Sequence, residues 1–310
     1  MTAPDPRGPL CPACGGADHR VLQRVPGPLL RALWRAEFGV DPGPMPTPTH
    51  YACSCGVTFF SPARAGDAAF YEALYRGFTV RGWMSRPATD RSDFLAALPH
   101  IRPGDAVLDV GGHNGAFGTL LRDARYTAID PHADRYASAG VLPETAAEHA
   151  ARRPEHYDVV TAFQVIEHVE EPRQLAQEML ACLKPGGLLI LAGPTWPSTM
   201  TEIPNMVINA PPHHLTWWSP AGFRRFAESL GLSVIEAREV EGGPALREGY
   251  YWLHRLMPKA SPETAFRHSW PLHLRLALAA LLRRPLNALV GTGSGRVVLD
   301  ALLVARKPGP

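Results

Sequence analysis

The sequence predicts an α/β protein: a doubly wound, mostly parallel sheet of seven strands, preceded by a small cysteine-rich module. From residue 103 onward, short apolar runs alternate with segments of helical length, the pattern of parallel strands joined by helices. The first apolar run leads directly into the glycine-rich segment GGHNGAFG at 111–118. Residues 1–65 differ from the rest, because they hold four of the five cysteines and many prolines and glycines.

Each element of the sheet has its own signal. Seven segments have strand character: 106–110, 126–130, a weaker one near 141–146, 157–163, 188–193, 232–240 and 296–307. Helices are expected from the glycine-rich loop to about Arg125, from about Pro172 to Leu183, and over 220–231. The glycines of KPGG, at 184–187, are expected to cap the second of these helices. A long connection before the last strand allows that strand to run antiparallel.

The chain divides into three parts. Residues 1–65 form the cysteine-rich module, 66–100 a helical cap, and 101–310 the main domain with an insertion at 241–291. The proline-rich stretch 41–49 is expected to be irregular. The insertion contains the amphipathic run WPLHLRLALAALL, which fits a lid, a homodimer face or a helix packed on the core.

Composition argues against two classes of partner. The formal net charge is +2, from 31 Lys and Arg against 29 Asp and Glu, with no basic block of the kind that binds nucleic acid. The N-terminal segment lacks the apolar core of a signal peptide. The most apolar run, Leu272–Leu282, is too short to span a bilayer and contains Arg275. We expect a cytoplasmic protein that binds neither nucleic acid nor membrane.

The glycine-rich loop predicts a cofactor site. Asp109 ends a buried strand, and three glycines that let a backbone approach a ligand follow it: Gly111, Gly112 and Gly115. The dinucleotide spacing G-x-G-x-x-G is absent, and the carboxylate of Asp109 would repel a pyrophosphate. It suits the ammonium group of S-adenosylmethionine. Asp130, which ends the next strand, stands where a carboxylate accepts hydrogen bonds from both ribose hydroxyls.

Four segments carry a family resemblance. VLDVGGHNGAFG, YTAIDP, YDVVTAFQVIEHVEEP and LKPGGLLILAGP resemble, in order, the successive motifs of class I S-adenosylmethionine-dependent methyltransferases, which have a Rossmann-like fold. The usual loop is D-x-G-x-G-x-G, and His113 stands in place of its middle glycine. This form is similar to the branch that includes sugar C-methyltransferases and related natural-product enzymes with an N-terminal zinc module.

The resemblance implies roles for particular residues. The methionine part of the cofactor would be held by Asp109, Gly111, Gly112 and Gly115, with His113 directed toward the cofactor carboxylate or the substrate. Asp130 and Pro131 would hold the ribose, and Glu148 would contact the adenine. Phe163 and Gln164 would line the methyl-donor site, beside the recurring pair Glu167 and His168.

The segment NAPPHHLTWWSP at 209–220 is the candidate catalytic segment. Methyl transfer from a sulfonium requires the acceptor to be positioned and to lose a proton, which a histidine can accept. We expect His214 or His213 to be the general base, with only one facing the substrate because the backbone is expected to be extended. A pair that caps the next helix is the alternative. Trp217 and Trp218 would wall a pocket.

Two tyrosines and the cysteines complete the candidate set. Tyr71 and Tyr75 would either close over the cofactor or pack on the sheet. Four cysteines form a C-x-x-C and a C-x-C pair that would hold a structural, zinc-ribbon-like Zn²⁺: Cys11, Cys14, Cys53 and Cys55. Because related modules usually have two residues inside the second pair, His50 is an alternative ligand, and a disulfide is the other interpretation. Cys182 is expected in the core.

Three functions follow. The first is methyl transfer to an oxygen or carbon of a small molecule, a sugar or specialised metabolite. The second is an RNA-modifying methyltransferase whose zinc module binds RNA, which the near-neutral charge disfavours. The third is a non-catalytic scaffold, which the intact cofactor motifs disfavour.

Overall fold

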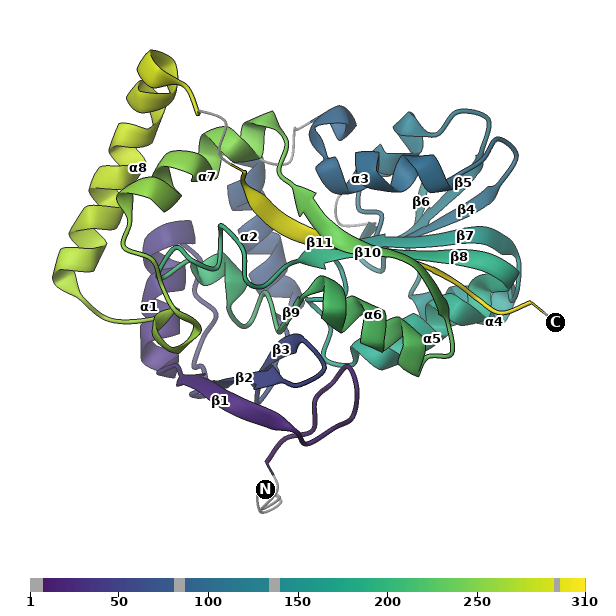
Figure 1. Ribbon diagram of the computed structural model, residues 1–310, viewed down its shortest axis with the longest axis horizontal. Coiled ribbons are helices and arrows are strands. Elements are labelled where there is room, and N and C mark those ends of the chain that lie inside the picture. Colours follow the sequence, from purple (N-terminus) through teal and green to yellow (C-terminus); the bar gives the residue numbers. More distant parts are fainter. Residues whose placement is uncertain (1–7, 81–86, 134–139, 293–295, 310) are drawn as a thin grey trace.

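The computed structural model describes residues 8–80, 87–133, 140–292 and 296–309. Its larger sheet has the strand order β10-β11-β8-β7-β4-β5-β6 (Figure 1). The strands are β4 (Ala106–Val110), β5 (Arg125–Ile129), β6 (Val141–Leu142), β7 (Tyr157–Phe163), β8 (Leu183–Pro194), β10 (Ser233–Glu241) and β11 (Val298–Arg306). β11 runs antiparallel to β8 and β10, whereas the other neighbours are parallel. The predicted mostly parallel, seven-stranded sheet is confirmed.

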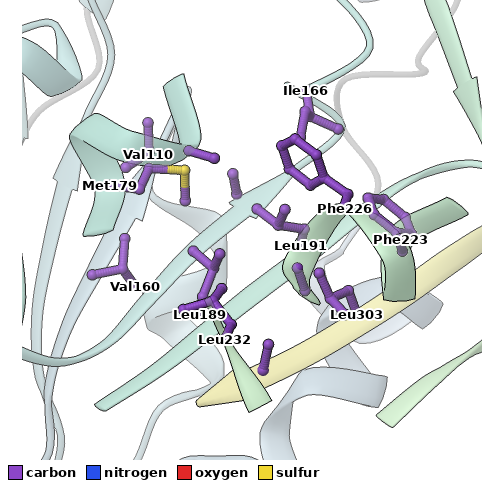
Figure 2. Packing of buried hydrophobic residues seen from close by; sticks show 14 of the residues in the cluster. Val110, Val160, Ile166, Met179, Leu189, Leu191, Phe223, Phe226, Leu232 and Leu303 are labelled. Atoms are coloured by element: carbon purple, nitrogen blue, oxygen red, sulfur yellow. The ribbon is translucent and has the colours of Figure 1, made fainter. Parts of the chain in front are cut away.

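Helices cover both faces of this sheet. α4 (Ala146–Arg152), α5 (Pro172–Cys182) and α6 (Pro220–Ser229) lie on one face, and α3 (Ser92–Ala97) lies on the other. Side chains alternate along β8 accordingly, as the pleat of a strand requires. Leu189 and Leu191 pack against α5 and α6 (Figure 2), while Ile190 and Ala192 join the cluster of the opposite face.

A second sheet holds the cysteine-rich segment. Its strands are β1 (His19–Arg24), β2 (Thr49–Cys53), β3 (Val57–Ser61) and β9 (Thr216–Trp218), in that order and all antiparallel. β9 comes from the candidate catalytic segment, so the small sheet is completed by a strand of the main domain. A helix that we did not predict, α1 (Gly27–Phe38), buries Leu30, Trp34 and Phe38.

One predicted helix and one predicted helix cap are wrong. After the glycine-rich loop there is only a short 3₁₀ turn, Ala116–Leu120, because Leu121 is extended and the chain turns back into β5. The glycines of KPGG do not cap α5, which ends at Cys182; they lie inside β8. Gly187 is needed there because a Cβ would come within 2.9 Å of the Asp158 carbonyl oxygen on the neighbouring strand.

The remaining helices lie in the cap and the insertion. α2 (Ala68–Val80) belongs to the cap, together with the 3₁₀ turns Ala88–Asp90 and Leu98–His100. In the insertion, α7 (Pro244–Leu256) packs against α8 (Trp270–Val290), and the 3₁₀ turn Pro262–Thr264 lies between them in the chain. Another 3₁₀ turn, Val207–Asn209, precedes β9 and lies outside the insertion. No helix in the described part of the chain combines the length and apolarity that a membrane crossing needs.

Candidate active site

The glycine-rich loop crosses from the end of β4 onto the end of β5. The N–H groups of Gly111 and Gly112 donate to the Ile129 carbonyl oxygen, at 2.8 and 3.1 Å. Gly111 has a φ of +72°, and a Cβ there would lie 2.5 Å from the Val165 side chain. A Cβ on Gly112 would lie 2.8 Å from that of Ala128. Side chains at these two positions are therefore excluded by backbone conformation and close packing.

Asp130 ties the loop to the end of β5. Its Oδ2 accepts a hydrogen bond from the His113 N–H at 3.2 Å, and its Oδ1 accepts one from the His132 N–H at 2.8 Å. The carboxylate is almost fully buried, next to the exposed Pro131. Two backbone donors orient it at the carboxyl edge of the sheet, where ligands bind in open α/β sheets.

Asp109 lies beneath the loop rather than on its surface. The Tyr126 hydroxyl donates to its Oδ2 at 2.7 Å, and the Thr161 hydroxyl donates to its Oδ1 at 2.8 Å. Burial raises the pKa of Asp109 to about 6, although these two hydrogen bonds favour the ionised form. The carboxylate thus supports the loop from below, and its contact with the cofactor ammonium stays a prediction.

Three other predicted cofactor residues have structural partners of their own. The Phe163 ring packs between Phe94 and Phe117, with ring centroids 4.9 and 4.7 Å away. The Gln164 N–H donates to the Ala192 carbonyl oxygen. Glu148 forms a capping box with Thr145 at the start of α4. Their contacts with the cofactor stay predictions.

A group of charged residues near this edge had not been singled out. Arg91 donates two hydrogen bonds to the buried carboxylate of Asp93, at 2.9 and 2.6 Å. Asp300, on β11, has its pKa raised to about 7 by burial and by Asp93, while a hydrogen bond from Gln164 lowers it. An acidic residue inside the apolar run VVLDALLV was a signal for Asp300.

The two predicted catalytic histidines lie on a turn. Both His213 and His214 donate their backbone N–H to the Ala210 carbonyl oxygen, at 3.1 and 3.2 Å. The expectation of an extended backbone with rings pointing opposite ways is therefore wrong. The two rings stack with centroids 4.6 Å apart, and the ring of His168 lies 4.4 and 4.9 Å from them. Three imidazoles form one cluster.

Burial sets the charge state of this cluster. It lowers the pKa of His168 to about 4 and holds those of His213 and His214 well below the ordinary value. All three rings are therefore neutral near pH 7. Glu167, fully buried beside them, has its pKa raised well above the usual range by burial.

Aromatic residues of α2 connect the histidines with the cofactor loop. The Tyr71 ring lies 5.9 Å from that of His213 and stacks on Tyr75, also at 5.9 Å. The Tyr75 ring in turn lies 5.9 Å from that of His113. These tyrosines form a wall beside both groups of residues.

The paired tryptophans do not line a pocket, contrary to expectation. Trp217 is 2% exposed and packs against His50, and Trp218 is fully buried and stacks on Phe223. Both belong to β9, so their side chains enter the cores on the two faces of the small sheet.

The four cysteines of the small sheet come together. The Sγ atoms of Cys11 and Cys55 lie 3.8 Å apart, and those of Cys14 and Cys53 lie 3.6 Å apart. These distances are too long for disulfides, and all four are free thiols. They fit the edges of a tetrahedron around zinc, about 3.8 Å for Zn–S bonds of about 2.3 Å. The group does not include His50, and Cys182 is buried in the core.

The fold and the glycine-rich loop are those of class I S-adenosylmethionine-dependent methyltransferases. The chain belongs to the family described as "Methyltransferase domain", which matches residues 80–237, about half of its length.

Individual relatives match parts of the chain. An uncharacterized methyltransferase of Mycobacterium tuberculosis is 33% identical over 109 residues, which cover 31% of this chain and 43% of that protein. A ubiquinone biosynthesis O-methyltransferase of Aeromonas salmonicida is 27% identical over 168 residues, 46% of this chain and 68% of that protein. A crystal structure of a methyltransferase from Archaeoglobus fulgidus superposes with a TM-score of 0.45 and 16% identity, covering 69% of this chain and 91% of that one. The chain spans less than half the length of the first curated relatives it matches.

Proposed function

We propose that this methyltransferase acts on an oxygen or carbon of a small molecule, a sugar or specialised metabolite. The observation that carries the proposal is the buried histidine cluster, which a tyrosine wall connects with the cofactor loop. His113 in that loop and the four-cysteine cluster also match the branch that includes sugar C-methyltransferases. Binding of nucleic acid or membrane is not part of the proposal.

In this proposal the carboxyl edge of the sheet holds S-adenosylmethionine. The methionine part lies against Asp109, the loop glycines and His113, and the ribose against Asp130 and Pro131. Glu148 contacts the adenine, and Phe163 and Gln164 stand beside the methyl donor. The surrounding carboxylates favour the sulfonium electrostatically.

His214 or His213 acts as the general base. The sulfonium is already an activated donor, so the protein's task is to position the acceptor and accept its proton. A neutral imidazole has a lone pair for that proton, and burial keeps both rings neutral near pH 7. His214 is our first choice and His213 the second.

Two measurements test this function. Calorimetry of the full chain with S-adenosylmethionine should show binding, and Asp130→Ala should weaken it. Transfer of a labelled methyl group to a panel of sugars and hydroxylated metabolites should fall at least about tenfold in His213→Ala or His214→Ala. The exposed His156→Ala is the matched control. Absence of cofactor binding would refute the cofactor assignment, and unchanged turnover in both histidine variants would refute the base.

The proposal also includes a structural zinc ion and a homodimer. Zinc would bind the four thiolates of the small sheet, whose separations suit it. The homodimer would cover α8, which exposes Leu274 and Leu281 by 73% each on one side of the helix. Light scattering of the purified protein distinguishes a dimer from a monomer.

A further inference from the structure

We propose that His168, His213 and His214, with the carboxylate of Glu167 beside them, bind a divalent transition-metal ion. This would be a second metal site, separate from the four-cysteine cluster. One ring nitrogen from each histidine lies within 4.8 Å of the others. Imidazole nitrogens around zinc stand roughly 3.3 Å apart, for Zn–N bonds of about 2.0 Å. Limited side-chain rotations would place all three nitrogens on one ion.

The tautomer of His168 is already that of a metal ligand. Its Nδ1 lies 2.6 Å from the carbonyl oxygen of His213. A carbonyl oxygen only accepts hydrogen bonds, so Nδ1 carries the proton, and Nε2 of the neutral ring keeps its lone pair. Metal-ligating histidines almost always donate their other ring N–H in this way. Nε2 is also the atom that lies 3.7 Å from Oε1 of Glu167.

Several buried polar atoms at this place lack a partner. They are Nδ1 of His213, Nδ1 of His214 and both carboxylate oxygens of Glu167. Glu167 is fully buried, and the two histidines are 5% and 6% exposed. Leaving such atoms unpaired costs about 1–3 kcal/mol for a polar group and more for a charged one. A bound dication would satisfy the nitrogen lone pairs and the carboxylate together.

The neighbours of the cluster leave room for the Glu167 carboxylate and enclose the His213 ring with aromatic side chains. A Cβ on Gly193 of β8 would lie 3.2 Å from Oε2 of Glu167, so the glycine makes space for this side chain. The rings of Trp34, Tyr71 and Phe78 lie 5.9 to 6.4 Å from that of His213. Aromatic packing of this kind keeps water away from the ligands.

The ligand set selects the class of metal. Three imidazoles suit Zn²⁺, Fe²⁺, Co²⁺ or Ni²⁺, whereas Mg²⁺ and Ca²⁺ prefer oxygen ligands. A histidine nitrogen that binds the ion cannot also accept a proton. In the metal-bound protein the ion would therefore take over the role proposed for His214 or His213, by lowering the pKa of an acceptor hydroxyl that contacts it. That consequence rests on the proposed methyl transfer, but metal binding itself does not.

Metal stoichiometry tests the site. The full chain, stripped with a chelator and reloaded with zinc, should hold about two ions, one at each site. His168→Ala combined with His213→Ala should hold about one, and His156→Ala about two. Glu167→Gln should weaken the second equivalent roughly 10- to 100-fold. A wild-type protein that holds one ion, retained in the histidine variant, would overturn the proposal.

A spectroscopic measurement needs no substitution. Cobalt-loaded wild-type protein should show two environments in X-ray absorption, one with sulfur ligands and one with nitrogen and oxygen ligands only. Sulfur ligands alone would overturn the proposal. Both measurements use neither cofactor nor acceptor, so a failed metal site and a failed methyl-transfer proposal are distinguishable.

Discussion

The Tyr126 hydroxyl donates a 2.7 Å hydrogen bond to Oδ2 of Asp109, the buried carboxylate beneath the glycine-rich loop. Tyr126 lies on β5 and Asp109 on the adjacent β4, so the bond joins the two strands from which the cofactor loop rises. Thr161, on the other neighbour of β4, binds the second carboxylate oxygen. The loop therefore stands on a carboxylate that three central strands hold in place.

Removing the Tyr126 hydroxyl should destabilise the protein. Tyr126→Phe takes one donor from a buried carboxylate, which should cost about 1–3 kcal/mol in the free energy of unfolding. Urea denaturation measures it. Thr161→Val is the matched variant at the other oxygen, and because both act on one carboxylate, the double variant should be non-additive. A Tyr126→Phe protein as stable as the wild type would show that the bond contributes nothing.

The buried carboxyl of Asp300 should make stability depend on pH. Its folded-state pKa of about 7 lies above the unfolded value of about 3.9, so the folded state binds more protons between these values. The stabilising contribution is complete below about pH 4 and is lost as the pH rises through about 7. Asp300→Asn should lose this slope, so its stability relative to the wild type should improve with rising pH. If the free energy of unfolding depended on pH in the same way in the wild type and in Asp300→Asn, the raised pKa of Asp300 would be contradicted.

Gly112 should tolerate no side chain. In Gly112→Ala, the new Cβ would lie 2.8 Å from Ala128 Cβ and 3.1 Å from Oδ2 of Asp109. We expect at least a roughly tenfold loss of affinity for S-adenosylmethionine by calorimetry, since the loop must move. Gly249 lies on α7, where an added Cβ would meet no other atom within 4 Å. Gly249→Ala is therefore the control and should bind S-adenosylmethionine normally. Equal affinities would show that the loop adapts.

Two variants separate the helix-capping role of Glu148 from its predicted contact with the adenine. Both hydrogen bonds that the Glu148 carboxylate accepts from Thr145 end on its Oε2, so an adenine amino group would bind Oε1. Thr145→Ala removes the cap at a cost of about 1 kcal/mol and should leave cofactor affinity unchanged. Glu148→Ala should also weaken cofactor binding about fivefold or more, if one hydrogen bond of about 1 kcal/mol is lost. Equal calorimetric affinities in the two variants would make Glu148 a capping residue alone.

The sequence predicts what depends on local pattern and misses what depends on contacts between distant segments. Six of the seven strands have a clear strand signal in the sequence, and Asp109, Asp130 and the loop glycines follow directly from the ends of two of them. The turn hydrogen bonds to Ala210, which place both histidine rings on one side, involve carbonyl geometry that residue types do not specify. The Arg91–Asp93 pair approaches Asp300 only because α3 packs across β11. Likewise, β9 was unpredictable because its partner, β3, lies more than 150 residues earlier.

That pairing connects the cysteine cluster with the histidines. β3 begins two residues after Cys55, and β9 begins two residues after His214. The Leu215 N–H also donates to the Glu167 carbonyl oxygen, and Leu215 accepts from the Phe60 N–H of β3. The position of the histidines therefore depends on the small sheet.

Loss of the proposed zinc ion should consequently lower both stability and activity. Cys14→Ser, or a strong chelator applied to the wild type, should lower the melting temperature, because buried thiols without an ion lose their shared bonding partner. Methyl transfer should fall in parallel. Affinity for S-adenosylmethionine should change little, because its predicted ligands lie at the carboxyl edge of the larger sheet. Cys182→Ala, outside the cluster, is the control that should keep its zinc. A zinc-free protein with full turnover would show that β9 holds the histidines without the metal.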